Sequence, residues 1–301
     1  MLQTGRFAPS PSGRMHLGNI FSALLAWLSV RSCGGRMLLR IEDLDPDRCR
    51  AAYADQLRRD LEWLGLDWDE EQTAQSLRTE AYAAQLARLC ELGLVYPCYC
   101  TRNELHAASA PHAADGTVRY AGTCRNLSPE ARAAKTRMPA WRLIVPDERI
   151  AFTDGVQGYY AQTLARECGD FIIRRSDGVF AYQLAVVTDD AAGGVSQIVR
   201  GCDLLSSTPR QIYLQRLLGF DTPAYYHVPL LLAHDGRRLS KRERDLDMQA
   251  LRLRCTPEEL VGGLAYLAGL LPRPETVRAG ELAADFSWSR VKRENILVEK
   301  L

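Results

Sequence analysis

Residues 4–30 read TGRFAPSPSGRMHLGNIFSALLAWLSV and join a short strand pattern, a turn rich in proline and glycine, and a long apolar run. The spacing predicts a strand over residues 4–10 and a helix that begins after Gly18. His16 stands in the turn between them. A glycine-rich turn that enters a helix presents unpaired backbone N–H groups at the positive end of the helix dipole. This stretch therefore predicts a binding site for phosphate, with His16 as an added donor.

A simpler interpretation is that His16 only makes a hydrogen bond where a helix begins, and for one isolated motif this interpretation is favoured. The stretch GRRLSKRERD at residues 236–245 supplies a second motif, with basic side chains around Ser240. Alone, it is typical of a solvated basic loop. Together with the first motif, more than two hundred residues earlier in the chain, it predicts the second wall of a triphosphate site.

The alternation of strand and helix patterns predicts the fold class. After the first helix, RMLLRIED (36–43) predicts a strand and RCRAAYADQLRRDLEWLGL (48–66) predicts a helix. Such a βαβα order favours a parallel sheet covered by helices on both faces, with the ligand site at the carboxyl ends of the strands. From Tyr96 the pattern becomes irregular and predicts hairpins at 149–160 and 171–185. We interpret this part as an insertion into a split α/β domain.

The second half of that domain resumes with SQIVRG (196–201) as a strand and STPRQIYLQRLLG (207–219) as a helix. In this helix we expect Thr208 to cap, Pro209 to occupy the first turn and Gln211 to complete a capping box. We divide the chain into a first half of the catalytic domain (1–95), an inserted subdomain (96–182), a second half (183–235), and a basic loop with a short helical C-terminal segment (236–301).

Composition limits the classes of function. The 38 lysines and arginines nearly balance the 37 aspartates and glutamates, so the net charge of +1 gives no global attraction to nucleic acid. The apolar runs are short for a membrane span, and the first residues lack a signal-peptide pattern. We therefore expect a cytoplasmic monomer without membrane association, in which a complete disulfide framework is excluded by the odd count of nine cysteines.

Three cysteines predict a metal site. Cys98, Cys100 and Cys124 lie in an irregular part of the chain, and thiolates at this spacing suit structural zinc with four tetrahedral ligands. By ligand chemistry alone, His106 or His112 is the fourth ligand. The alternative is a set of free cysteines in an insertion that has lost its metal. The remaining six are interpreted as small buried apolar residues: Cys33, Cys49, Cys90, Cys168, Cys202 and Cys255.

PSPSGRMHLGN (9–19) and RLSKR (238–242) resemble the H-x-G-H and K-M-S-K-S signatures of class I aminoacyl-tRNA synthetases, in the order typical of the glutamate branch. The similarity extends from residue 5 to about residue 245 through GRFAPSPSG (5–13), LRIEDLDPDR (39–48), AYQLAVVTDD (181–190), IVRGCDLLSSTPRQ (198–211) and HVPLLLAHDGRRLSKR (227–242). In two departures, Asn19 replaces the second histidine and Arg238 replaces the first lysine. We expect neither to abolish the use of ATP.

The resemblance implies a split Rossmann-type nucleotide-binding domain with an inserted zinc-containing α+β subdomain. It implies Tyr120 as the fourth zinc ligand, beside Cys98, Cys100 and Cys124. It implies glutamate activation by in-line attack of the carboxylate on the α-phosphorus of ATP, with Mg²⁺ on the triphosphate and with His16 and Lys241 as the catalytic pair that stabilises phosphate charge. The implied ATP-binding residues are His16, Gly18, Asn19, Leu239, Ser240 and Lys241.

The amino-acid pocket follows from both charge and resemblance. A guanidinium is the best partner for a carboxylate. The resemblance implies glutamate contacts from Arg6, Phe7, Ala8, Pro9, Ser10, Glu42, Tyr182 and Arg200. Glu42 is assigned to the ammonium, and Arg6, Tyr182 and Arg200 mainly to the carboxylates. Without the resemblance, each arginine could equally form a surface ion pair and Tyr182 could be a core aromatic. Asp43 and Asp45 could orient Arg6 or Arg40, but we expect them to cap the next helix.

The chain ends at residue 301, where a discriminating glutamyl-tRNA synthetase continues into an anticodon-reading domain. This shortness, the H-L-G-N motif and the cysteine pattern resemble the glutamyl-Q tRNA(Asp) synthetases. Members of that subfamily activate glutamate without tRNA and transfer it to the queuosine base in the anticodon loop of tRNA(Asp). The alternatives are a truncated glutamyl-tRNA synthetase and an inactive paralogue that binds RNA or protein. Candidate basic contacts to RNA are Arg237, Arg244, Arg252, Arg254, Arg290, Lys292 and Arg293.

Overall fold

The structure is a computed structural model that describes residues 2–101, 104, 119–237 and 247–298. The first part of the chain alternates strands and helices, as its sequence predicts. Its elements are β1 (Thr4–Phe7), α1 (Leu17–Arg31), β2 (Arg36–Arg40), α2 (Ala51–Trp63), β3 (Glu70–Gln72), the 3₁₀ helix η1 (Gln75–Leu77) and α3 (Thr79–Glu91). Strands β1, β2 and β3 pair in parallel in that order.

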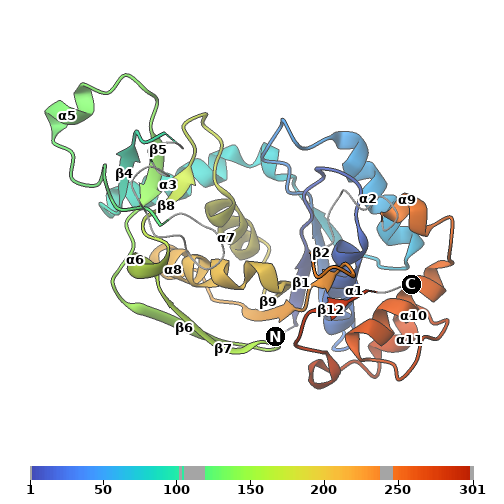
Figure 1. The fold of residues 1–301 in the computed structure, drawn as a ribbon. Coiled ribbons are helices and arrows are strands. Elements are labelled where there is room, and N and C mark those ends of the chain that lie inside the picture. The colour runs from blue at the N-terminus through green and yellow to red at the C-terminus, as the bar shows by residue number, and fades with distance from the viewer. Residues whose placement is uncertain (1, 102–103, 105–118, 238–246, 299–301) are drawn as a thin grey trace.

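In the residues that the structure describes, the irregular middle part contains short antiparallel strands and two short helices. Its elements are β4 (Val95–Cys98), α5 (Pro129–Ala133), β5 (Ala140–Leu143), β6 (Arg149–Asp154), β7 (Gly158–Thr163), α6 (Leu164–Glu167) and β8 (Phe171–Arg174). Strands β4, β5 and β8 form one antiparallel sheet, and β6 and β7 form the hairpin predicted at 149–160. In Figure 1 the β4-β5-β8 sheet lies at the end of the molecule opposite the C-terminal helices.

The last part returns to the parallel arrangement. Its elements are α7 (Tyr182–Ala192), β9 (Gln197–Gly201), the 3₁₀ helix η2 (Cys202–Ser207), α8 (Thr208–Leu218), β10 (Ala224–Val228), β11 (Leu231–Leu232), α9 (Met248–Leu251), α10 (Pro257–Ala268), α11 (Ala279–Ala283), the 3₁₀ helix η4 (Trp288–Arg290) and β12 (Ile296–Leu297). The C-terminal segment is thus not only helical, because β12 pairs in parallel with β11.

The two halves of the α/β domain meet between β1 and β9. The backbone N–H of Ser196 donates to the carbonyl of Thr4 at 2.9 Å, which places β9 beside β1. With β10 paired to β9, the strands follow the order β3-β2-β1-β9-β10. The chain leaves β1 toward one edge of this sheet and returns at β9 to build the other edge. Such a reversal of strand order opens a crevice at the carboxyl ends of the strands, where ligands bind.

Helices cover both faces of the sheet, and the strand residues alternate between two apolar cores. Met37, Leu39 and Ile41 belong to the core formed with α1 and α10. Leu38, between them, belongs to the core formed with α3, α7 and α8. This alternation follows from the period of two in a strand, and it explains why β2 is apolar at successive positions. None of the helices in the described parts of the chain is long and apolar enough to cross a membrane.

Three local predictions were wrong, and a fourth was confirmed only in part. The predicted hairpin at 171–185 forms only around its Asp-Gly turn, where Arg174 bridges Phe180 and the N–H of Ala181 donates to the carbonyl of Ile173; the chain then enters α7 at Tyr182. Thr208 is not a cap: Ser207 precedes α8, with no side-chain cap bond. The Thr208 hydroxyl instead contacts Arg200, and Gln211 donates to Gln183.

Asp43 and Asp45 do not cap α2, which begins after Arg50 without a side-chain cap. Asp43 instead accepts from the N–H and hydroxyl of Ser76 in η1, and Asp45 forms an ion pair with Arg175 at 3.6 Å. The six remaining cysteines are not buried. Cys33 and Cys90 are exposed, and Cys49, Cys168, Cys202 and Cys255 are half-buried. Their positions at the ends or outer faces of elements explain why the apolar pattern around them did not imply burial.

Candidate functional site

A cleft of about 420 Å³ opens at the carboxyl ends of β1 and β9, beside the first turn of α1. The structure brings all the predicted pocket residues that it describes into this cleft. They are Arg6, Phe7, Ala8, Pro9, Ser10, His16, Gly18, Asn19, Glu42, Tyr182 and Arg200. Leu239, Ser240 and Lys241 lie outside the described residues, as do Arg238 and Arg244. The cleft therefore joins residues from the start, the middle and the second half of the chain.

His16 is the N-cap of α1, which begins at Leu17. Its Nδ1 accepts a hydrogen bond of 3.1 Å from the N–H of Gly18, and its own N–H donates to Oδ1 of Asn19 at 3.1 Å. A Cβ at position 18 would come within 3.2 Å of the His16 ring, so glycine allows the ring to lie over the helix start. With Nδ1 as the acceptor, a neutral His16 carries its proton on Nε2.

The cap shows that the simpler interpretation of His16, a hydrogen-bonded helix start, describes part of its role. It does not exclude the other part, because His16 also lines the cleft. The segment after the second motif returns to the same place. The backbone of Asp247 forms an isolated antiparallel bridge with His16, and Met248 donates to the carbonyl of Met15 at 3.0 Å. The first described residue after the basic motif thus lies directly beside His16.

A buried ion network supports one wall of the cleft. Arg40, which is completely buried, lies 2.7 Å from Asp190, 3.1 Å from Glu42 and 3.9 Å from Asp189. Arg6 lies 3.4 Å from Asp190 and donates to the carbonyl of Val199. Burial works to lower the pKa of Arg40, but the three carboxylates raise it above its ordinary value. Arg40 therefore stays charged and holds the carboxylates in place.

Among the carboxylates of this network, that of Glu42 also lines the cleft. Burial raises the pKa of Glu42 above its ordinary range, although Arg40 and Arg6 oppose the shift. Its carboxylate accepts from Nη2 of Arg40 at 3.1 Å, and its backbone N–H donates to the carbonyl of Pro9. A carboxylate fixed in this way suits an incoming ammonium group, which would replace the lost solvation of the charge.

Arg200 also lines the cleft and has different partners. Its Nε donates to Nε2 of His227 at 3.0 Å, Nη2 donates to the Thr208 hydroxyl at 2.8 Å, and Nη1 lies 3.4 Å from the Tyr182 hydroxyl. Tyr182 is the first residue of α7, not a residue at a hairpin edge. Burial, which disfavours phenolate, raises the pKa of the Tyr182 hydroxyl, so Tyr182 acts as a neutral donor or acceptor in the cleft.

The sequence patterns assigned no place in the pocket to several residues that support it. They are Arg40, Asp154, Asp189, Asp190, Thr208 and His227. Asp189 accepts from Gln75, Arg78 and Tyr82, so it joins α7 to α3 and to the segment before it. The sequence does indicate that Asp189 and Asp190 are buried, because they follow an apolar helix pattern that predicts burial for one face of the helix. Two carboxylates at buried positions require partners.

The predicted RNA-contacting residues differ in their surroundings. Arg252 pairs with the buried Asp60 at 2.9 Å and lies over the Trp63 ring, so its contacts join α9 to α2. Arg290 donates to the carbonyl of Leu270. Arg237 pairs with Asp235 on the surface. These contacts favour structural roles for Arg252 and Arg290 and leave the RNA-binding assignment a prediction.

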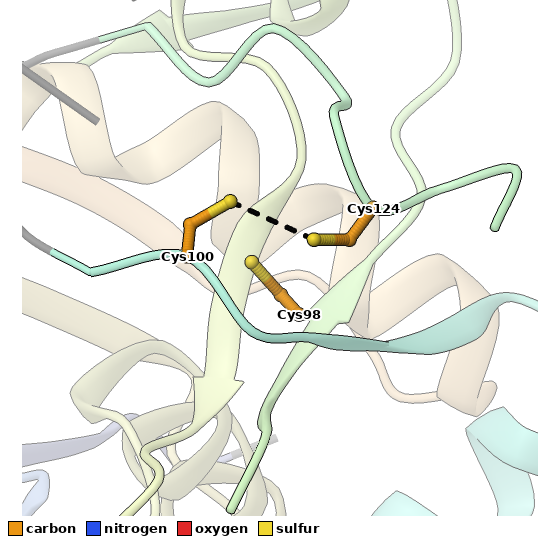
Figure 2. Close-up of side chains that lie close together, drawn as sticks. All are labelled: Cys98, Cys100 and Cys124. Carbon is orange, nitrogen blue, oxygen red and sulfur yellow. Dashed lines mark hydrogen bonds between the residues drawn. The ribbon is translucent and has the colours of Figure 1, made fainter. Parts of the chain in front are cut away.

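The three predicted metal-binding cysteines converge at the end of β4. Their sulfur atoms all lie within 4.8 Å of one another, and the Sγ atoms of Cys100 and Cys124 are 3.6 Å apart (Figure 2). The hydroxyl of Tyr120 lies 3.4 Å from Sγ of Cys98 and 3.9 Å from Sγ of Cys100. Tetrahedral zinc with bonds of about 2.3 Å to sulfur requires sulfur atoms about 3.8 Å apart. The three sulfur atoms are compatible with this spacing, and the phenol oxygen of Tyr120 lies beside two of them, whereas His106 and His112 lie outside the described residues.

The surroundings of the cluster favour negative ligands. The guanidinium of Arg142 lies 3.7 Å above the Tyr120 ring, and the N–H of Tyr99 points to Sγ of Cys124 at 3.5 Å. Burial alone raises the pKa of the Cys98 thiol, but hydrogen bonds between Cys98 and the side chains of Tyr120 and Arg142 contribute to a net lowering. A cation and N–H donors around thiolates are the outer partners that metal sites require.

Comparisons with known proteins agree with this geometry. The family described as tRNA synthetases class I (E and Q), catalytic domain, matches residues 3–289. A relative from Nitratidesulfovibrio vulgaris, named glutamyl-Q tRNA(Asp) synthetase, is 54% identical over 89% of this chain and 87% of its own. A relative of the same name from Symbiobacterium thermophilum is 51% identical over 98% of this chain and 95% of its own.

Among solved structures, a glutamate tRNA ligase from Elizabethkingia meningosepticum, in complex with its amino acid, matches with a TM-score of 0.84 and 25% identity. The match covers 99% of this chain and 67% of that one. A glutamate-tRNA synthetase from Elizabethkingia anophelis matches with a TM-score of 0.85, covering 99% of this chain and 68% of that one. The described cleft therefore belongs to a catalytic fold shared with synthetases that handle glutamate.

Proposed function

Because the chain belongs to the class I tRNA synthetases and, within them, to the glutamyl-Q tRNA(Asp) synthetases, we propose that this ligase activates L-glutamate with ATP and without tRNA. It then transfers the glutamate to the queuosine base in the anticodon loop of tRNA(Asp). The observation that carries the proposal is the cleft, in which Arg6 and Arg200 face the same space as Glu42. Two guanidinium groups and one carboxylate match the two carboxylates and one ammonium of glutamate.

The chemistry needs no side-chain nucleophile. A carboxylate oxygen of glutamate attacks the α-phosphorus of ATP in line, and pyrophosphate leaves with the electrons of the broken P–O bond. Mg²⁺ bound with ATP would neutralise part of the charge on the triphosphate, as such substrates require. His16 at the start of α1 and Lys241 in the basic motif stabilise the phosphate charge, and Gly18 and Asn19 contact ATP from the first turn of α1. Leu239 and Ser240 complete the ATP contacts.

The bridge between Asp247 and His16 supports this pairing of the two motifs, because it brings the chain just after the basic motif to the helix start that carries the first one. The positions of Phe7, Ala8, Pro9, Ser10 and Tyr182 around the cleft support the glutamate contacts that the resemblance implies for them. We keep the division at residues 95, 182 and 235 as part of the proposal.

Structural zinc is the proposed cofactor, about one ion per chain, held by Cys98, Cys100, Tyr120 and Cys124. The metal would fix the end of β4 against the segment that carries Tyr120 and Cys124. The sulfur spacing and the position of the phenol oxygen support this ligand set. Zinc would supply folding stability to the inserted subdomain and takes no part in the transfer.

The experiment that tests the function is transfer of labelled glutamate, with ATP, to three purified tRNAs: tRNA(Asp) with queuosine, tRNA(Asp) without it, and tRNA(Glu). We expect label only on the tRNA that carries queuosine. Label on tRNA(Glu) would show that the protein charges a 3′ end in the ordinary way. Absence of both label and glutamate-dependent ATP–pyrophosphate exchange would show an inactive paralogue.

A further inference from the structure

A chain of buried hydrogen bonds runs from the β6–β7 hairpin to the cleft. Asp154, at the end of β6, lies with its Oδ2 2.6 Å from Nδ1 of His227 on β10. Nε2 of His227 in turn lies 3.0 Å from Nε of Arg200, which lines the cleft. The side chains of Asp154 and His227 are fully buried, and Arg200 is 5% exposed. The hairpin of the inserted part thus reaches an arginine of the pocket through one histidine.

The donors and acceptors fix the direction of this chain. The Asp154 carboxylate also accepts from the N–H groups of Val156, Gln157 and His227, so it is held as an acceptor on every side. Nδ1 of His227 must therefore carry the proton that faces Asp154. Nε2 then has only a lone pair, and that lone pair accepts from the Nε–H of Arg200.

The protonation states agree with this direction. Burial lowers the pKa of His227 below its ordinary value, and the charge of Arg200 lowers it further, although Asp154 and Asp203 oppose the shift. Burial works to raise the pKa of Asp154, but the hydrogen bonds from His227 and the backbone produce a net lowering. His227 is therefore a neutral ring beside an ionised Asp154 at neutral pH.

This arrangement gives Arg200 an environment unlike that of Arg40. Arg40 lies between three carboxylates, which neutralise it. Arg200 instead contacts the neutral ring of His227 and two hydroxyl groups, and within the described ranges it forms no ion pair with a carboxylate. Its Nε and Nη2 edges are occupied by neutral acceptors. The guanidinium is thus held in one orientation while its charge stays available for an anion in the cleft.

We propose that His227, held in its Nδ1–H tautomer by Asp154, is a positioning residue that aims Arg200 at a carboxylate of the amino-acid substrate. The inference rests on the proposed function, because it takes glutamate as the occupant of the cleft. His227 acts through Arg200 and lies outside the lining of the cleft. Its effect falls on substrate binding more than on the transfer of the adenylyl group.

The test compares two variants, each of which keeps one of the two hydrogen-bonding positions of the imidazole ring. His227→Gln places a carbonyl oxygen near the position of Nε2 and keeps an acceptor for Arg200. His227→Asn places an amide near the position of Nδ1 and keeps the bond to Asp154, but it does not reach Arg200. The readout is glutamate-dependent ATP–pyrophosphate exchange without tRNA, measured for KM and kcat, with thermal unfolding as the control for folding.

We expect His227→Asn to raise the KM for glutamate by about tenfold or more, because a lost hydrogen bond to a charged group weakens binding by that order. We expect kcat to change much less, and His227→Gln to keep a KM near that of the unaltered protein. A merely structural histidine would give two variants that lose stability without this difference in KM. That result would overturn the proposal.

Asp154→Asn supplies a second variant with the same prediction. Its amide N–H would face Nδ1, move the ring proton to Nε2, and set that proton against the Nε–H of Arg200. The tautomer itself is measured without any variant, from the ¹⁵N shifts of the histidine rings in the folded protein. A protonated or Nε2–H ring at His227 near neutral pH would overturn the proposal. If the unaltered protein shows no glutamate-dependent exchange, the proposed function fails. If the protein is active but the KM for glutamate is unchanged in His227→Asn and in Asp154→Asn, only the positioning role is refuted.

Discussion

Asp190 on α7 accepts a hydrogen bond of 2.7 Å from Nη1 of Arg40 on β2, and both side chains are almost fully buried. The same carboxylate lies 3.4 Å from Nε of Arg6. One aspartate therefore joins the second half of the α/β domain to two arginines of the first half. Since Arg6 lines the cleft, this contact links the stability of the fold to the shape of the pocket.

Replacing Asp190 tests that link. Asp190→Asn leaves two buried guanidinium groups without this charge, and we expect the free energy of unfolding to fall by about 3 kcal/mol. The KM for glutamate should rise as Arg6 loses its support. Denaturant unfolding and pyrophosphate exchange measure the two effects. Asp147→Asn is the matched control, because Asp147 pairs with Arg166 on the exposed surface and its loss should cost less than about 1 kcal/mol. Equal effects of the two changes would contradict the role of Asp190.

The two roles of His16 can be separated by one substitution. His16→Asn keeps a good N-cap for α1, so the free energy of unfolding should change by less than about 0.5 kcal/mol. Asparagine does not extend as far as the imidazole, so adenylate formation should slow by about a hundredfold through loss of a donor to the phosphates. Unfolding curves and the rate of pyrophosphate exchange measure these two quantities. Normal exchange in this variant would mean that His16 only caps the helix.

The stability of the protein should depend on pH through His227. The pKa of His227 is lowered in the folded state, chiefly by burial. In the folded protein its imidazole therefore stays neutral at a pH where the same imidazole in the unfolded chain takes up a proton. The stabilisation is therefore complete above the unfolded pKa of about 6.5 and is lost as pH falls below it, by at most about 1.4 kcal/mol per pH unit.

Asp154 contributes in a separate, more acidic range. Its pKa is also lowered on folding, so its stabilisation is complete above the ordinary value of 3.8 and is lost as pH falls further. Denaturant unfolding at pH 7, 6 and 5 separates the two groups. The unaltered protein should lose more free energy of unfolding over this range than His227→Gln, which cannot take up the proton. Parallel curves for both proteins would contradict the lowered pKa of His227.

The ligand set of the metal site is also testable. Metal analysis of the pure protein should give about one zinc per chain, and Cys124→Ser should abolish it. Tyr120→Phe should weaken zinc binding by at least about tenfold, while alanine at His106 or His112 should leave it unchanged. Cys33→Ser is the control, because Cys33 is exposed and distant in sequence from the cluster. If Tyr120→Phe kept its zinc and an alanine variant of His106 or His112 lost it, that histidine would be the fourth ligand in place of Tyr120.

The local sequence determined two elements that support the pocket, the capped helix α1 and the β6–β7 hairpin. The strand and the capped helix around His16 follow from the apolar periodicity and the glycines of residues 4–30. The hairpin at 149–160 follows from alternating residues on either side of an Asp-Gly turn. Each of these depends on contacts between residues close in the chain, so a pattern of side chains is sufficient to predict it.

Only the tertiary structure decided which buried polar groups meet. The sequence predicts Thr208 as a helix cap, but its hydroxyl accepts a hydrogen bond from Arg200. The sequence predicts Tyr182 as a hairpin residue, but it is the first residue of α7. His227 and Asp154 are 73 residues apart, and no local pattern connects them. The motifs and the family were readable from the sequence because they are short and local. The partners of Arg200 were not, because a buried charge is satisfied by whatever donors and acceptors the topology brings to it.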